Sequence, residues 1–332
     1  MNTPSAPRFS LLMAVYNAAP YLDKAIESVR QQTLTDWELV CVDDGSTDDS
    51  LSVLQGYAAL DSRIKVLSGQ GNQGPAKARN RALEVTTGQY IAMLDADDWL
   101  SEDALQCVAD VFAQHPATDC VLFSLVEEYP DSRNLYAMPY GPGDVFTGKD
   151  AFRLSLDWRI HGLYAVRRAI HLRFPYDDSC RLHSDDNTTR IHYLHSREVR
   201  ISKGEYHYRK RSDSISFAVG LDHFGYLDAN LSMKRQLEAE LGADGLVDEA
   251  DLSFYERHRW LNYVGMHWYL FVNKRAFDKT ETEMIRKKLR GFYDTFTLPL
   301  PRKFGYTRKK KYSLFLLQEW LYFRMRWLMG RR

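Results

Sequence analysis

Cysteine is scarce in this 332-residue chain, and its four cysteines show none of the spacings typical of zinc sites or redox pairs. We therefore expect reduced thiols, as in cytosolic proteins. The first residues lack the charged start and apolar core of a secretory signal. No uninterrupted apolar run reaches membrane-spanning length. These absences together predict a cytoplasmic location.

Glycine-rich phosphate-binding loops are also missing. No G-x-G-x-x-G follows the first apolar segment, Phe9 to Val15, and no Walker sequence occurs in the chain. Dinucleotide oxidoreduction and P-loop ATP hydrolysis are therefore disfavoured. If the protein binds phosphates, side chains and a metal ion must neutralise them, because no glycine cradle is present.

Net charge is absent as well, since 44 Lys and Arg balance 44 Asp and Glu. The charges are nevertheless unevenly distributed. Residues 1–110 contain 16 acids against 8 Lys and Arg, whereas residues 302–332 contain 10 Lys and Arg and the single acid Glu319. The acidic part and the basic tail should therefore meet different partners, and we expect no nucleic acid among them.

An acidic motif follows an apolar segment in the first third of the chain. Tyr90 to Leu94 carries no charge, which predicts a strand buried on both faces of a parallel sheet. Asp95, Asp97 and Asp98 follow directly. Carboxylates this close repel one another unless a cation lies between them, and a divalent ion shared with phosphate oxygens meets that need. A solvated acidic turn is the alternative.

Strands and helices alternate through the first 125 residues. The segments 9–15, 38–42, 64–67, 90–94 and 120–125 read as strands. This order predicts an α/β fold with a parallel core sheet and right-handed crossovers. The second strand ends in Asp43 and Asp44, so two strands end in paired acids at one edge. That edge is expected to bind a nucleotide diphosphate, with Asp44 contacting the base or ribose.

Two helix starts are predicted from acidic and hydroxyl residues. Asp48 and Asp49 should lie in the first turn of the second helix, with Ser46 or Thr47 as its N-cap. The helix after the acidic motif should be capped by Ser101.

Four motifs, in this order and spacing, resemble the family 2 glycosyltransferases of GT-A fold. They are Ala-Val-Tyr-Asn at 14–17, Val-Asp-Asp-Gly-Ser-Thr-Asp at 42–48, Asn72-x-Gly74 with Ala78-Arg79-Asn80, and Leu-Asp-Ala-Asp-Asp at 94–98. The resemblance covers residues 8 to about 125 and extends to bacterial members that build surface polysaccharides. It implies a GT-A type, Rossmann-like sheet flanked by helices, with a helical C-terminal extension.

The resemblance also implies roles for individual residues. Asp44 reads the base, usually uracil, beside a pocket formed by Ala14, Val15, Tyr16 and Asn17. Asp97, in the DxD motif, binds Mg²⁺ or Mn²⁺ on the diphosphate. Asp95 contacts the ribose or the metal's shell, and Ala96 lies between them in the nucleotide site. Arg79 is a candidate for contacting donor phosphate, with a surface ion pair as the alternative.

A second acidic pair supplies the candidate general base. His183-Ser184-Asp185-Asp186 stands where the family usually shows Gly-Glu-Asp, so Asp186 matches the base and Asp185 the preceding acid. The alternative is that both acids cap the helix 187–194. The segments Tyr206-x-Tyr208-Arg209-x-Arg211 and Ser214-Ile215-Ser216 resemble the family's closing segment, with an ordinary strand and basic turn as the alternative.

The expected function is inverting transfer of a hexose or N-acetylhexosamine from a UDP-sugar to a hydroxyl of a glycan or lipid-linked acceptor. A non-catalytic protein that binds nucleotide sugars or glycans is one alternative. A sugar nucleotidyltransferase is another, but residues 16–20 do not form the glycine-rich basic loop of such enzymes.

Three regions are expected along the chain. Residues 1–125 form the donor-binding half and 126–220 the acceptor and base half of one GT-A domain, and 221–332 form a helical region. Aromatic residues in 251–296 should build a small core of their own. The basic run Arg308 to Lys311 and the aromatic segment Tyr312 to Met329 suit the cytoplasmic face of the inner membrane. Docking on the protein's own core or on a second copy are the alternatives.

Overall fold

The computed structural model describes residues 6–69, 71–180, 185–211, 219–242, 246–296 and 312–329. Three predicted segments lie outside these ranges, namely His183-Ser184, Ser214-Ile215-Ser216 and the basic run 308–311. The chain divides into two compact units, Met1–Ser214 and Ile215–Arg332. Each unit is described by itself.

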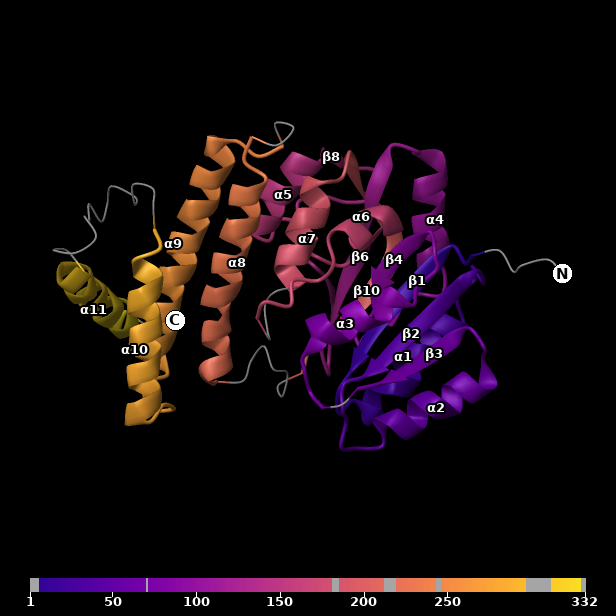
Figure 1. Ribbon diagram of the computed structural model, residues 1–332, viewed down its shortest axis with the longest axis horizontal. Helices are drawn as coiled ribbons and strands as arrows, with labels where there is room; N and C mark the ends of the chain where they lie inside the picture. Colours follow the sequence, from indigo (N-terminus) through magenta and orange to yellow (C-terminus); the bar gives the residue numbers. More distant parts are fainter. Residues whose placement is uncertain are drawn as a thin grey trace. The chain divides into compact units, whose positions relative to one another are not determined.

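The first unit is a mixed sheet with helices on both faces (Figure 1). Its strands are β1 (Phe9–Val15), β2 (Trp37–Asp43), β3 (Ile64–Ser68), β4 (Tyr90–Met93), β5 (Trp99–Leu100), β6 (Thr118–Glu128), β7 (Arg133–Leu135), β8 (Val145–Thr147), β9 (Tyr164–Arg167) and β10 (Glu198–Arg209). Its helices are α1 (Ala19–Arg30), α2 (Ser50–Leu60), α3 (Pro75–Glu84), α4 (Ala104–Gln114), α5 (Gly148–Leu156), α6 (Arg168–Arg173) and α7 (Asp185–Leu194).

The main path of the sheet is β3-β2-β1-β4-β9-β6-β10-β5. The predicted parallel core is confirmed for β3-β2-β1-β4 and for the pair of β6 and β10. The sheet is mixed outside this core, because β9 lies antiparallel between β4 and β6. This strand, Tyr164–Arg167, was not predicted from the sequence.

Alternate residues of the central strands enter two separate cores, as a period of two requires. Leu11 and Met13 of β1 pack in the core that includes side chains of α1, α2 and α4. Leu12 packs on the opposite face, in the core that includes side chains of α3, α5 and α7. Burial on both faces is what the uncharged sequence of these strands predicts.

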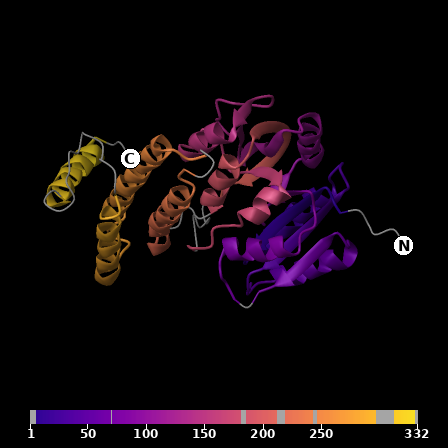
Figure 2. The same cartoon turned by 45° about the horizontal axis from the view of Figure 1, so that its top comes forward.

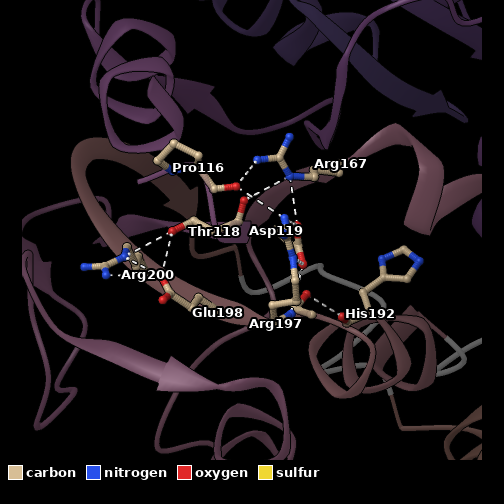
Figure 3. Close-up of polar contacts among 9 residues, drawn as sticks. Pro116, Thr118, Asp119, Arg167, His192, Arg197, Glu198 and Arg200 are labelled. Carbon is tan, nitrogen blue, oxygen red and sulfur yellow. Dashed lines mark hydrogen bonds and ion pairs between the residues drawn. The ribbon is translucent and has the colours of Figure 1, made fainter. Parts of the chain in front are cut away.

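A cluster of charged residues fixes the amino ends of β6 and β10 (Figure 3). Asp119 accepts hydrogen bonds from the Arg197 backbone N–H (2.9 Å) and guanidinium (2.7 and 2.8 Å), and Arg167 Nε lies 2.8 Å from Asp119 Oδ1. Burial opposes ionisation of Asp119, but the bonds from Arg197 outweigh it and lower the pKa. This cluster lies at the sheet edge opposite the carboxyl ends of these strands.

The second unit is helical. It contains η1 (Leu221–Phe224), α8 (Gly225–Ala239), α9 (Glu249–Val272), α10 (Lys279–Tyr293) and α11 (Tyr312–Leu328). Figures 1 and 2 show α8, α9 and α10 side by side. Trp260, Tyr263 and Tyr293 are almost fully buried in a shared core, so the predicted aromatic core is confirmed. Capping boxes at Asp248 and Asp278 start α9 and α10.

Candidate active site

Two acidic segments lie at the same edge of the sheet. β2 and β4 both run parallel to β1, so their carboxyl ends point the same way. Asp43 and Asp44 lie at the end of β2, and the segment 95–98, called the acid loop below, follows β4. The parallel core therefore places the predicted acids on one rim, where open α/β sheets bind ligands.

The segment after β1 is joined to the segment after β2. Asn17 adopts a left-handed conformation (φ 49°), which asparagine tolerates better than most residues. Its backbone N–H donates to Ser46 Oγ (3.0 Å), and its Oδ1 accepts from the Thr47 N–H (2.8 Å). Val15 is buried, whereas Tyr16 is exposed and available to a ligand. The structure thus brings two of the predicted nucleotide-binding motifs into contact.

Asp44 is buried beneath this turn. Its Oδ2 accepts hydrogen bonds from the backbone N–H groups of Gln73 (3.0 Å) and Gly74 (2.7 Å), so the third motif is bound to the second. Asp43 accepts bonds from Gly45 and Ser46 in its own turn (3.3 Å each). Asp43 therefore shapes the turn, and Asp44 is the acid that connects motifs.

The predicted helix caps were wrong at both positions. Helix α2 begins at Ser50 with Asp49 as N-cap, while Ser46 and Thr47 bind Asn17 instead. Helix α4 begins at Ala104 with Asp103 as its N-cap residue, two positions after the predicted Ser101. In both cases the hydroxyl that the local pattern assigned to a cap forms other hydrogen bonds. Ser46 Oγ accepts from the Asn17 N–H, and Ser101 Oγ accepts from the Glu205 N–H.

Each carboxylate of the acid loop has a basic or hydroxyl partner. Asp95 pairs with Arg79 (Oδ1 to Nη2, 2.6 Å) and Asp97 with Arg211 (Oδ2 to Nη2, 3.0 Å). Asp98 is almost fully buried and accepts bonds from the Tyr206 hydroxyl (3.0 Å) and the Arg209 N–H (2.8 Å). The loop is therefore folded inward on its counter-charges and is not a solvated turn.

The partners of the acid loop come largely from the end of β10. The Tyr206 hydroxyl also accepts from the Asp95 N–H (3.0 Å), and Arg209 Nε donates to the Asp97 carbonyl (2.8 Å). Sequence reasoning gave these residues no individual role. Tyrosine and arginine alternate at 206–211, and this pattern was interpreted either as the family's closing segment or as an ordinary strand. The structure shows a strand whose end binds the acids.

We expect Tyr206→Phe to destabilise the first unit by about 2 kcal/mol, because it deprives a buried carboxylate and a backbone N–H of their hydrogen-bond partner. The free energy of unfolding in urea measures this. Tyr208→Phe is the matched control on the same strand, since its hydroxyl makes no hydrogen bond to the described residues. Equal losses for both variants would contradict this account of Tyr206.

The acid loop has the electrostatic character of a cation site. Burial, and then the charge of Asp95, raise the pKa of Asp97, although Arg211 opposes the shift. Burial and the same neighbouring acids raise the pKa of Asp98 well above its usual range. Burial and repulsion among these acids thus disfavour the charged forms of Asp97 and Asp98, and a bound cation would favour them.

The carboxylates of the acid loop can be compared with the ligands that Mg²⁺ usually has in proteins. Within the described ranges, no three or more His, Cys, Asp or Glu side chains are arranged to hold a metal ion. Mg²⁺ is usually bound through one or two carboxylates, with waters and substrate phosphates completing the shell. Asp97, with Asp95 beside it, is therefore compatible with a metal that the protein and a diphosphate bind jointly.

The candidate base lies at the start of α7. Asp185 and Asp186 occupy its first turn, where their charge also favours the helix dipole. Arg79 Nη1 lies 3.7 Å from Asp185 Oδ2, so one buried arginine contacts both Asp95 and Asp185. Asp186 lies 3.9 Å from Arg190 on the next turn. The structure therefore connects this acidic pair to the acid loop through Arg79.

Arg79 is not a surface ion pair, since only 4% of it is exposed. Its guanidinium carbon lies 5.5 Å from the centre of the Tyr176 ring, and Tyr176 is held by two backbone bonds to Asn80 (2.8 and 2.9 Å). Nε and Nη1 of Arg79 have no hydrogen-bond partner among the described residues. No sequence signal pointed to Tyr176.

Comparison with protein families gives a match to Glycosyl transferase family 2 over residues 10–172. Chondroitin synthase of Escherichia coli is 37% identical over 129 residues, which are 39% of this chain and 18% of that protein. In several curated relatives the match covers less than half of the relative's own length. The family match, over residues 10–172, includes the part of the chain that carries the acid loop.

Solved structures show the same fold. The crystal structure of Staphylococcus aureus TarS 1-349 in complex with UDP-GlcNAc superposes with a TM-score of 0.64 at 19% identity, covering 87% of this chain and 82% of that one. The mannosyltransferase PcManGT of Pyrobaculum calidifontis, in complex with GDP-Man and Mn²⁺, gives 0.53 at 16% identity, covering 86% and 80%. At these identities the likeness establishes the GT-A fold alone.

Proposed function

The chain belongs to glycosyltransferase family 2, and we propose that it transfers a hexose or N-acetylhexosamine from a UDP-sugar to a hydroxyl group. The observation that carries this proposal is the acid loop, whose three carboxylates lie at the rim of a GT-A sheet, where burial and mutual repulsion disfavour the charged forms of Asp97 and Asp98. A divalent ion that is shared with the diphosphate would supply positive charge there. TarS and PcManGT, which share the fold, bind nucleotide sugars.

The donor half, residues 1–125, binds the nucleotide in this proposal. Asp44 accepts a hydrogen bond from the base, usually uracil, beside Ala14, Val15, Tyr16 and Asn17. Asp95 and Ala96 lie at the ribose. Nε and Nη1 of Arg79 have no hydrogen-bond partner among the described residues, which makes its guanidinium a candidate donor to the substrate's phosphate or sugar.

Asp97, with Asp95, would hold Mg²⁺ or Mn²⁺. When bound, such an ion acts as a Lewis acid that stabilises the charge developing on the departing diphosphate. The protein's own part is to exclude water and to hold the loop in place through Tyr206 and Arg209. Preorganised groups of this kind cost no reorganisation when the bond breaks.

The acceptor half, residues 126–220, supplies the base in this proposal. Asp186 takes the proton of the attacking hydroxyl from the side of the sugar opposite the diphosphate. A single in-line displacement inverts the anomeric carbon, so an α-linked donor gives a β-linked product. We propose a glycan or lipid-linked acceptor, in keeping with the chondroitin synthase among the relatives.

A panel of UDP-sugars tests the proposal. Incubation with Mn²⁺ should release UDP slowly from one of them by hydrolysis, and faster once an acceptor is added. A protein that binds UDP-sugars without any turnover would be a binding protein instead, and pyrophosphate-dependent UTP formation would indicate a nucleotidyltransferase.

Helix α11 carries an unusual excess of exposed apolar side chains, including Trp320, Tyr322 and Trp327. Only Phe323 is buried among the large apolar side chains of the helix that the structure describes; its ring lies 5.2 Å from that of Trp268. None of the described helices has both the length and the hydropathy of a membrane span. We propose that α11 lies on the anionic cytoplasmic face of the inner membrane, since the sequence around it is strongly basic.

Replacing Trp320 and Trp327 by serine should weaken binding to vesicles containing anionic lipid by about tenfold or more, because two aromatic anchors are lost. Cosedimentation measures this. Leu60→Ser with Leu135→Ser is the matched control, since both leucines are exposed in the first unit. Unchanged partitioning of the tryptophan variant would refute the membrane role.

A further inference from the structure

One acid of the loop is paired with an arginine from far along the chain. Arg211 Nη2 lies 3.0 Å from Asp97 Oδ2, and the two side chains are 25% and 24% exposed. Asp97 is the acid that the proposed function assigns to the metal. A protein side chain therefore stands beside this carboxylate as a counter-ion.

Arg211 also rests on an aromatic ring. Its guanidinium carbon lies 4.5 Å from the centre of the Tyr21 ring on α1. The neighbouring Arg209 is used differently, because its backbone N–H and Nε bind the acid loop at Asp98 and at the Asp97 carbonyl. Arg209 thus holds the shape of the loop, whereas Arg211 forms an ion pair with a carboxylate oxygen that a bound cation would use.

Arg211 and a divalent ion compete for Asp97 on electrostatic grounds. An ion bound to this carboxylate would place two positive charges within a few ångström of the guanidinium, and like charges at such a distance repel. The Tyr21 ring would still attract the displaced guanidinium through a cation–π contact. A diphosphate nearby offers several anionic oxygens, which arginine binds in a bidentate manner.

We propose that Arg211 is an exchangeable counter-ion: it pairs with Asp97 in the nucleotide-free protein, is displaced by the divalent cation, and then donates hydrogen bonds to the donor's diphosphate. This inference rests on the proposed function and assigns a new residue to it. Removal of Arg211 therefore has opposite effects on metal binding and on nucleotide binding.

The test measures both affinities in the full chain. Mn²⁺ binding without nucleotide is followed through the electron paramagnetic resonance of the free ion, and UDP binding at saturating Mn²⁺ by calorimetry. We expect Arg211→Gln to bind Mn²⁺ about three- to tenfold more tightly, because its competitor is gone, and UDP about tenfold more weakly. Arg211→Lys keeps the positive charge but loses the planar guanidinium that binds phosphate in a bidentate manner. Its Mn²⁺ affinity should therefore stay near that of the wild type, and its UDP affinity should fall.

Arg133→Gln is the control, because Arg133 is a half-exposed arginine of the same unit that pairs with Glu128 and Glu205. It should leave both affinities unchanged. If Arg211→Gln binds Mn²⁺ no more tightly than wild type, Arg211 is not a competitor and the inference is overturned; unchanged UDP affinity overturns its diphosphate role. A folded wild type that binds neither Mn²⁺ nor UDP is a different result, since it removes the proposed function itself.

Discussion

Replacing Asp97 with asparagine should reduce metal-dependent release of UDP by about 10²–10³-fold, the usual loss when one group that stabilises transition-state charge is removed. The amide is nearly isosteric with the carboxylate but carries no charge, so the loss reports on cation binding and not on packing. Metal-stimulated hydrolysis of the UDP-sugar identified in the panel measures it.

The same substitution should not harm stability. The pKa of Asp97 is raised by burial and by Asp95, so its ionised form is unfavourable in the metal-free protein. Because the pKa of Asp97 is raised on folding, the protonated carboxyl stabilises the folded state at pH values below the unfolded pKa of 3.8. This contribution is lost as the pH rises through the folded pKa. Removing the charge should therefore leave the melting temperature equal or higher at neutral pH.

Asp131→Asn is the control for this prediction, because it makes the same chemical change on an exposed loop of the same unit. It should affect neither UDP release nor melting temperature. An Asp97→Asn protein that keeps most of its Mn²⁺-dependent turnover would show that Asp97 does not bind the metal.

The same pKa predicts how metal binding depends on pH. Protons and the metal compete for the Asp97 carboxylate, and its pKa is above the ordinary aspartate value. Mn²⁺ affinity should therefore begin to fall at a higher pH than it would for an unperturbed aspartate. Titrations of Mn²⁺ at several pH values measure this, and affinity that is constant to the pH at which ordinary carboxylates protonate would contradict the assignment.

The parts of the fold that sequence predicted are those set by local pattern. β1 has the predicted bounds, Phe9–Val15, because an apolar run between polar residues is a complete local signal. β2, β3, β4 and β6 were found with shifted ends. β9, Tyr164–Arg167, was missed because it lies outside the segments whose pattern indicated a strand. The predicted caps of α2 were wrong because Ser46 and Thr47 form hydrogen bonds with Asn17 instead, which lies 29 and 30 residues away in the chain.

The candidate site also has a part that the sequence predicts and a part that it does not. Asp44 and the acid loop could be placed on one edge from strand order alone, because parallel strands share a carboxyl edge. Their partners could not, since Tyr206 meets Asp98 across 108 residues and Arg79 meets Asp95 across 16 in the chain. Such contacts depend on which strands become neighbours, and no local pattern encodes that.

Asp186→Asn should abolish sugar transfer while leaving the donor site intact. Loss of a general base costs about 10²–10⁴-fold in rate, and we expect kcat for transfer to fall in this range. The Kd for UDP with Mn²⁺ should stay within about twofold of wild type, because Asp186 makes no contact with the acid loop in this proposal. Transfer to acceptor and UDP binding are measured on the same preparation.

Asp185→Asn is the matched comparison, since it changes the neighbouring acid of the same helical turn. Asp185 lies near Arg79, which also pairs with Asp95, so its loss should disturb donor affinity more than kcat. The two variants therefore separate a base from a residue that positions Arg79. If Asp186→Asn transfers sugar at the wild-type rate while Asp185→Asn does not, Asp185 is the base. If both variants transfer sugar normally, the two acids only stabilise the first turn of α7 through their interaction with the helix dipole.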